Sequence, residues 1–311
     1  MSPTNGTLFV TGVSGLVGRA LLARLAPRRV DDGKGARPER VLGLSRNVSA
    51  VSESNVTLLK GNLLDAGSYR EHLAGADAIV HLAALTGKAR QAEYERVNVD
   101  GTRLLLDAAR EAGVKRFFYV STIATTYPEH DSYPYARSKA AAEKLVRESG
   151  LEWSILRPTI VLGKRAPAWQ SMVSMAGLPV IPFFGPGTTR VQPVLVGDLA
   201  DAIGSWCASD EFLGQALDVG GPEVLTFEEL IRRIRESRGG GRGRVLHLPA
   251  GLVKGCLNLA EPLLLPVLPL TAGQLYPFIY DSIAAPNALT ERLAGGMRDV
   301  DGILRELGAR G

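Results

Sequence analysis

A tyrosine and a lysine stand four residues apart in Tyr135-Ala-Arg-Ser-Lys139, and two hydroxyl residues, Ser121 and Thr122, precede them. The spacing places Tyr135 and Lys139 on one face of a helix. A nearby ammonium lowers the pKa of a phenol, which is normally near 10. We therefore expect Tyr135 to exchange a proton with a carbonyl or alcohol oxygen near neutral pH. Thr122 or Ser121 would hold that oxygen, and Lys139 would also bind a nicotinamide ribose.

A glycine-rich loop lies near the N-terminus, between an apolar run and a helical pattern. Gly12 permits a tight turn, Gly15 lets the backbone approach a pyrophosphate, and Gly18 lets the helix pack closely on the strand. The N-terminus of the following helix offers N–H donors to the phosphates. The residues expected to bind a dinucleotide here are Thr11, Gly12, Ser14, Gly15, Leu16, Val17 and Gly18. The alternative is a strand–helix turn without a ligand.

The second apolar run ends in Leu44-Ser45-Arg46. A site specific for NAD usually places an acidic residue there to hold the ribose 2′-hydroxyl. Ser45 and Arg46 instead offer a hydroxyl and a guanidinium, which suit a 2′-phosphate. The sequence therefore predicts NADP(H) as the cofactor, with Arg46 as an ordinary surface charge being the alternative.

The elements that must position these residues alternate along the chain. Apolar runs predict strands at 7–11, 41–45, 56–60, 77–82, 116–121, 153–157 and 216–220, and helical periodicity predicts helices at 16–26, 66–73, 91–112, 134–149 and 197–208. Apolar strands that alternate with helices indicate a parallel sheet covered on both faces. We therefore predict an α/β fold with a doubly wound parallel Rossmann sheet.

The pattern changes after Arg157, where the chain becomes rich in Pro, Gly, Met and aromatic residues. We predict an NADP(H)-binding Rossmann domain from residues 1–163 and 190–222, and a smaller, mainly helical substrate lobe from 164–189 and 223–311. One tryptophan and two methionines in this region recur at helical spacing, which indicates packing in a core. Together with two phenylalanines they could instead form an apolar wall of a substrate site. These residues are Trp169, Met172, Met175, Phe183 and Phe184.

Composition narrows the function classes. Of the 311 residues, 45% are hydrophobic, which suffices for one full-sized core and a smaller lobe. The net charge is +4, but the basic residues are scattered, so no nucleic acid is expected as a partner. Their densest group, Arg238, Arg242 and Arg244, lies in a glycine-rich stretch that indicates a solvated linker.

Cysteine and histidine usage and the apolar segments bear on location. Cys207 and Cys256 are far apart and are expected to be buried free thiols in a reducing compartment, and no histidine spacing indicates a metal site. No signal peptide is indicated, which predicts a cytoplasmic protein. Segment 252–270 is interrupted by charges and prolines, so it does not indicate a membrane span. It could line an apolar pocket or rest on a membrane surface.

Taken together, these motifs make the chain resemble the extended and atypical short-chain dehydrogenases/reductases over nearly its whole length. The matching features are TGVSGLVG, GNLLD (61–65), HLAA (81–84), Asn98 with Thr102, VST (120–122), YARSK, LRP (156–158) and PVLVGDLADAI (193–203). The segments that follow LRP, together with 269–281, are similar to the branch of this NAD-dependent epimerase/dehydratase-like family that includes the complex I accessory subunit.

The resemblance implies further cofactor positions. Asn62 and Leu63 would lie beside the adenine, and Ala83 and Ala84 beside the phosphate–ribose portion. Pro158 and Thr159 would lie near the nicotinamide, and Leu82 and Asn98 also fall on cofactor-binding positions of the family. The family often has Asp where Asn62 stands, and the segment after Thr122 is shorter than in many sugar-nucleotide epimerases, which leaves the choice between Ser121 and Thr122 open.

Three functional hypotheses follow from these observations. The first is an NADP(H)-dependent oxidoreductase that transfers hydride to a carbonyl or related group of a hydrophobic small molecule. The second is a nucleotide-sugar epimerase or dehydratase with tightly bound NAD. The third is a structural or sensing subunit that binds NADPH without turnover. A homodimer is a family expectation only.

Overall fold

The computed structural model describes residues 6–25, 38–47, 55–241, 243–265, 267–268, 270–293 and 295–308. Ala26, the predicted last residue of the first helix, and Arg242 of the predicted solvated linker lie outside the described residues.

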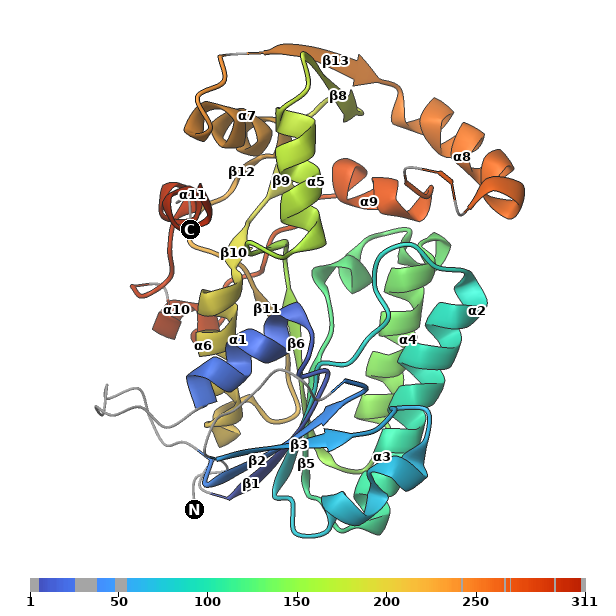
Figure 1. Cartoon of the computed structure of the whole chain (residues 1–311), viewed down its shortest axis with the longest axis vertical. Helices are drawn as coiled ribbons and strands as arrows, with labels where there is room; N and C mark the ends of the chain where they lie inside the picture. Colours follow the sequence, from blue (N-terminus) through green and yellow to red (C-terminus); the bar gives the residue numbers. More distant parts are fainter. Residues whose placement is uncertain are drawn as a thin grey trace.

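A seven-stranded sheet forms the centre of the larger lobe (Figure 1). Its strands, in spatial order, are β11 (Ala216–Val219), β6 (Glu152–Pro158), β5 (Arg116–Val120), β4 (Ala78–His81), β1 (Thr7–Thr11), β2 (Arg40–Ser45) and β3 (Val56–Lys60). All six neighbouring pairs are parallel. Chain order reverses direction between β1 and β4, which is the point where doubly wound folds bind ligands.

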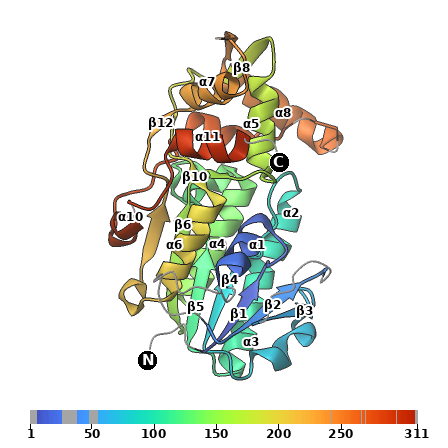
Figure 2. The same cartoon turned by 60° about the vertical axis from the view of Figure 1, so that its left-hand side comes forward.

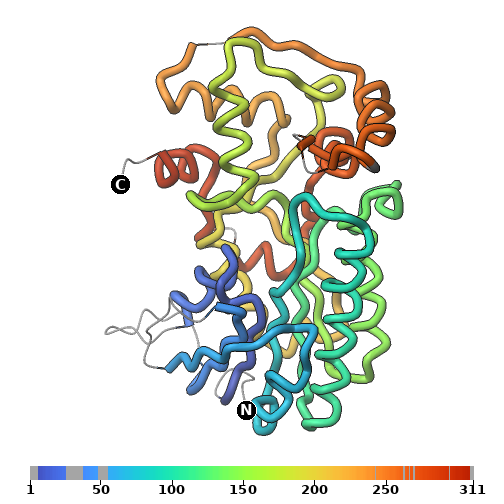
Figure 3. Tube along the Cα trace, turned by 45° about the vertical axis from the view of Figure 1, so that its right-hand side comes forward, coloured from blue at the N-terminus to red at the C-terminus, as the bar shows by residue number. Residues whose placement is uncertain are grey.

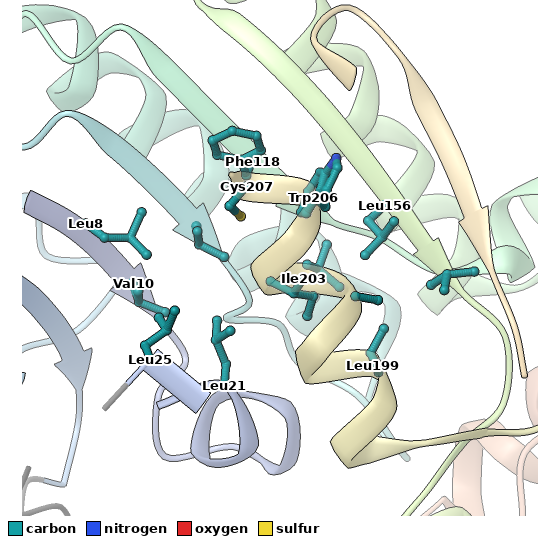
Figure 4. Packing of buried hydrophobic residues seen from close by; sticks show 14 of the residues in the cluster. Leu8, Val10, Leu21, Leu25, Phe118, Leu156, Leu199, Ile203, Trp206 and Cys207 are labelled. Carbon is teal, nitrogen blue, oxygen red and sulfur yellow. The ribbon is translucent and has the colours of Figure 1, made fainter. Parts of the chain in front are cut away.

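Alternate residues of β1 supply the cores on the two faces of this sheet, as strand geometry requires. Leu8 and Val10 pack with α1 (Leu16–Leu25) and α6 (Val196–Cys207), and Trp206 fills the centre of that layer (Figure 4). Phe9 points the other way, into the core beneath α3 (Gly101–Glu111) and α4 (Pro134–Arg147). Burial on both faces explains why these strands are apolar throughout.

The predicted helices form with two differences in detail. The helix predicted at 91–112 consists of α2 (Gln91–Tyr94), a π-helical turn at Glu95–Asp100, and α3. The helix predicted at 66–73 is wrong: the chain forms two short 3₁₀ turns, Ala66–Ser68 and Arg70–Leu73. The Ser68 hydroxyl donates to the Asp65 carbonyl at 2.6 Å, and such local side-chain bonds compete with α-helical pairing.

The smaller lobe lies beyond the end of β6, where the chain passes into the short strand β7 (Val161–Leu162) (Figure 2). Its elements are α5 (Pro167–Ala176), β8 (Val180–Phe184), β9 (Arg190–Val191), β10 (Val194–Leu195), β12 (Leu225–Thr226), α7 (Phe227–Ser237), β13 (Arg244–Leu248), α8 (Ala250–Leu264), α9 (Tyr276–Ile279) and α11 (Val300–Gly308). Helix α10 (Ala288–Leu293) instead packs against α6 and β11 of the larger lobe, where Leu289 is buried. None of the helices in the described part of the chain is both long and apolar enough to cross a membrane. The domain bounds given above stay a prediction.

Packing bears on two sequence expectations, one for the aromatic and methionine residues of this lobe and one for the two cysteines. Trp169, Met172 and Phe183 are buried with one another in its core, as the core-packing interpretation predicts. Met175 and Phe184 are half-buried, and the apolar substrate wall stays a prediction. Cys207 is buried as expected, and burial raises the pKa of its thiol. Cys256 lies exposed on α8, so the prediction that both thiols are buried is wrong for this one.

Candidate active site

The glycine-rich loop has the backbone geometry that the motif predicts. Gly12 adopts φ +74°, and a Cβ there would lie 2.6 Å from the Ala83 nitrogen. A Cβ on Gly18 would lie 2.3 Å from the Gly12 carbonyl oxygen, so α1 packs directly against the loop. Ser14 and Gly15 are exposed at the start of α1, where N–H groups suit a phosphate. The loop therefore fits a dinucleotide, with Leu16 and Val17 half-buried behind it.

Thr11 and His81 link the loop to the rest of the sheet. The Thr11 hydroxyl lies 2.6 Å from His81 Nδ1 and accepts from the Ala83 nitrogen, so it donates to the imidazole. His81 Nε2 donates to Thr102, whose own proton goes to the Asn98 carbonyl. Burial, and then Lys139, lower the pKa of His81 to about 3. His81 is thus a neutral structural link and not a general base.

The carboxyl end of β2 lies beside the loop, because Leu44 pairs with Thr11. Ser45 is buried, and its hydroxyl donates to the Asn47 carbonyl at 2.7 Å and accepts from the Asn47 nitrogen. Arg46 is exposed. Of the two predicted 2′-phosphate ligands, Arg46 is therefore the one whose side chain is available, while Ser45 shapes the turn.

The cofactor positions that the family resemblance implies differ in how far their side chains are exposed. Asn62 is exposed, and its side chain accepts from the Leu64 nitrogen. Leu63 is buried in the core, so only its backbone can face an adenine. Leu82, Ala83 and Ala84 are half-buried along the loop after β4.

Asn98 has a positioning function within the π-helical turn, a feature often found near functional sites. Its amide is buried, accepts from the Leu85 nitrogen at 2.7 Å and donates to the Leu85 carbonyl. It also donates to Ser138 on α4. Because these bonds occupy the amide, Asn98 holds the loop that follows β4 and does not itself offer a free ligand.

Tyr135 and Thr122 come together as predicted. The Thr122 hydroxyl lies beside the Tyr135 phenol, where it lowers the pKa of the phenol in part, and it accepts from the Ala124 nitrogen at 3.3 Å. Thr122 is therefore placed to share an oxygen ligand with Tyr135. Burial, and next the nearby Tyr94, outweigh this effect and raise the pKa of Tyr135 to about 12.

Lys139 departs from the expectation that it lowers the pKa of Tyr135. Its ammonium donates to the Val120 carbonyl at 2.8 Å and lies 4.1 Å from the centroid of the Tyr119 ring. Lys139 is 1% exposed, and this burial lowers its own pKa to about 7, opposed by the Glu143 carboxylate. The prediction of a lowered phenol pKa is wrong because burial of Tyr135 outweighs any effect of this lysine.

Ser121 faces a different partner. Its hydroxyl is buried and lies near Glu143, where it helps to lower the pKa of that carboxyl, although it lies outside good hydrogen-bond geometry. Glu143 is 2% exposed and accepts two bonds from Arg157, at 2.8 and 2.6 Å. Of the two hydroxyl residues, Thr122 is therefore the one placed at the phenol.

Pro158 is the last residue of β6 and Thr159 follows it, and both residues are buried. The Thr159 nitrogen donates to the Val219 carbonyl at 2.9 Å, and its hydroxyl donates to the Gln192 carbonyl. The Thr159 side chain thus ties β6 to the return segment and leaves no proton for a ligand.

Sequence reasoning missed the aromatic surroundings of Tyr135. The Tyr94 and Tyr133 rings lie 6.0 and 5.8 Å from its ring, centroid to centroid. Tyr133 stacks on Tyr276 of α9 at 5.5 Å with a 10° interplanar angle. Tyr276 lies far from Tyr135 in the sequence, so no local spacing connects the two residues. Only Tyr133, two residues before Tyr135, carried a signal that local reasoning could have used.

Comparison with known proteins agrees with this geometry. Residues 8–215 match the model of the NAD dependent epimerase/dehydratase family. The chain belongs to this family. The predicted doubly wound fold and the predicted resemblance to extended short-chain dehydrogenases/reductases are thereby confirmed.

Similar members of the family differ in what their names say they do. A ceramide reductase of Caulobacter vibrioides is 30% identical over 247 residues, covering 78% of this chain and 74% of that protein. A mitochondrial NADH dehydrogenase [ubiquinone] 1 alpha subcomplex subunit 9 of Arabidopsis thaliana is 28% identical over 230 residues, covering 71% and 55%. The chain spans 50 to 66% of the length of several curated relatives.

A solved structure shows the same fold. The dTDP-glucose 4,6-dehydratase DesIV of Streptomyces venezuelae, with NAD and TYD bound, matches with a TM-score of 0.71 at 23% identity. The match covers 97% of this chain and 96% of that one. Both lobes of the present structure thus follow an arrangement already seen in that structure.

Proposed function

We propose that this chain is an NADP(H)-dependent reductase that delivers hydride to a carbonyl or related unsaturated group of a hydrophobic small molecule. The observation that carries the proposal is the half-buried Tyr135 phenol beside Thr122, with Lys139 one helical turn further on. The ceramide reductase is a relative named for reduction of a lipid, and it supports a hydrophobic substrate.

The protonation state of Tyr135 favours reduction. With a pKa of about 12 the phenol keeps its proton throughout the neutral range, so it is suited to donate a proton to a developing alkoxide. Thr122 would hold the same oxygen, and Lys139 would be the cation nearest to the site. A bound nicotinamide supplies the hydride in this chemistry.

The cofactor would lie across the carboxyl ends of β1, β2 and β4. The loop around Gly12, Gly15 and Gly18 would hold the pyrophosphate, and Arg46 would hold a 2′-phosphate. Asn62 and the backbone of Leu63 would contact the adenine. The preference for NADP(H) over NAD depends on Arg46 alone, since the Ser45 hydroxyl is engaged in its own turn.

Turnover by a Tyr135→Phe variant tests the chemistry. NADPH oxidation would be followed with a panel of long-chain ketones, and the variant should lose about 10²- to 10⁴-fold in kcat while its Kd for NADPH stays unchanged. Tyr133→Phe is the control, because it removes a neighbouring hydroxyl and leaves Tyr135 in place. Undiminished turnover by Tyr135→Phe would refute the assignment and favour a cofactor-binding protein without catalysis.

A fluorescence titration with NADPH and NADH tests the cofactor. Arg46→Ala should weaken NADPH binding about tenfold or more and leave NADH binding unchanged, because only the 2′-phosphate meets the guanidinium. Arg40→Ala, an exposed arginine at the opposite end of β2, is the matched control. Tighter NADH binding by the wild type, or NAD that co-purifies with it, would instead support the epimerase or dehydratase hypothesis.

A further inference from the structure

Helix α8 carries an apolar face that points away from the protein. Leu252, Leu259 and Leu263 are 68%, 82% and 85% exposed, and their spacing places them on one side of the helix. Val267, just beyond the helix, is 77% exposed and continues the surface. Figure 3 shows this orange helix at the outer edge of the smaller lobe. We call Leu252, Leu259, Leu263 and Val267 the α8 face.

The opposite side of the same helix is already packed. Leu257 is buried with Ala272 and Leu275, and Val253 packs against that cluster. The Glu261 carboxylate turns inward and accepts from the Ala272 nitrogen. Since the core contacts of α8 are made by its inner side, the exposed leucines on the outer side contribute nothing to the described core. An exposed apolar patch of this kind marks an interaction surface.

Basic side chains border the α8 face. The Lys88 ammonium donates to the Leu268 carbonyl at 2.8 Å, which brings the loop before α2 against the end of this surface, and Lys88 and Arg90 are exposed there. On α8 itself, Lys254 pairs with Glu129 at 3.1 Å. The basic residues at this end come from the loop before α2 and not from α8 itself, but an apolar surface with Lys and Arg beside it suits the interface of an anionic bilayer.

The α8 face is connected to the proposed reacting group. Lys254 lies 4.6 Å from the centroid of the Tyr276 ring, on which Tyr133 stacks. Tyr133 in turn contacts the Tyr135 ring. The helix with the exposed leucines is therefore connected to Tyr135 through one cation–π contact and two contacts between aromatic rings.

We infer that the α8 face docks on a lipid bilayer that carries anionic headgroups. Leu259 and Leu263 would enter the acyl boundary, while Lys88 and Arg90 would meet the headgroups. A second part of the inference rests on the proposed function: the substrates are lipids of that bilayer, and the enzyme would bind them next to Tyr135.

Sedimentation of the full chain with vesicles tests the docking. Wild type should pellet with phosphatidylcholine vesicles that contain phosphatidylserine, and Leu259→Ser/Leu263→Ser should lower the partition coefficient about tenfold or more. Arg90→Gln should lower it about fivefold on these vesicles only, not on pure phosphatidylcholine. Val224→Ser, an apolar residue 44% exposed in the linker before β12, should bind as wild type does.

Two results would overturn the inference. One is a wild-type chain that stays in the supernatant with both kinds of vesicle. The other is a dimer in light scattering that the double leucine variant dissociates, because the α8 face would then be covered by a second copy. Vesicle binding without NADPH-dependent turnover would refute the proposed function and leave the docking intact. Turnover of dissolved ketones without vesicle binding would refute the docking and leave the proposed function intact.

Discussion

Replacement of Glu143 by Gln tests the buried charge cluster behind the candidate site. The Glu143 carboxylate accepts two bonds from Arg157, one from Arg147 at 2.9 Å and one from Thr125 at 3.1 Å. Removing the charge leaves the guanidinium of Arg157, 19% exposed, with Asp218 at 3.9 Å as its remaining acidic partner. Breaking a buried pair in this way costs about 3 to 5 kcal/mol, and we expect about 3 because Arg157 keeps Asp218.

Urea denaturation of both proteins measures this loss. Burial would raise the pKa of Glu143, but Arg157 and its other partners together lower it below its usual value. The carboxylate therefore stabilises the fold fully above the unfolded-state pKa of about 4.3, and this contribution disappears as the pH falls through the lower folded-state pKa. The difference between wild type and variant should thus be constant from neutral pH down to about pH 5 and shrink below that.

Glu148→Gln is the matched control for this experiment. Glu148 follows five residues later at the end of α4, with its side chain 61% exposed and 3.9 Å from Lys144. Its replacement should change stability by less than about 0.5 kcal/mol. The reasoning is refuted if Glu143→Gln costs no more than this control. A second readout is the pKa of Lys139, which Glu143 raises, so the variant should move the pH midpoint that reports Lys139 below about 7.

Two further substitutions, each with a matched control, probe the loop and the hydroxyl pair. Gly18→Ala should lose about 2 kcal/mol in urea denaturation and weaken NADPH binding, because its Cβ would lie 2.3 Å from the Gly12 oxygen. Gly204→Ala in α6, where no atom lies within 4 Å of the new Cβ, should instead gain about 0.5 to 1 kcal/mol, and a loss there would contradict the packing described. Thr122→Ala should lower kcat about a hundredfold while Ser121→Ala leaves it unchanged, and the reverse order in steady-state kinetics would return the role to Ser121.

Much of the fold follows from local sequence pattern. The seven predicted strands and the helices between them form within one or two residues of the expected bounds, apart from 66–73. Periodicity decides these elements because strands buried on both faces must be apolar throughout and helices must carry an apolar stripe. The glycine loop was equally predictable, since Gly12 needs a positive φ and Gly18 a close contact that no other residue permits.

Contacts between side chains of distant segments could not be predicted from local pattern. Sequence left Ser121 and Thr122 equivalent, and the approach of α4 to the end of β5 directs Thr122 to Tyr135 and Ser121 toward Glu143. Burial then reversed the expected direction of the Tyr135 pKa, because desolvation depends on neighbours that no spacing specifies. Cys256 shows the same limit: an apolar segment can equally face the core or the outside, and only the packing of α8 placed this thiol on the exposed side.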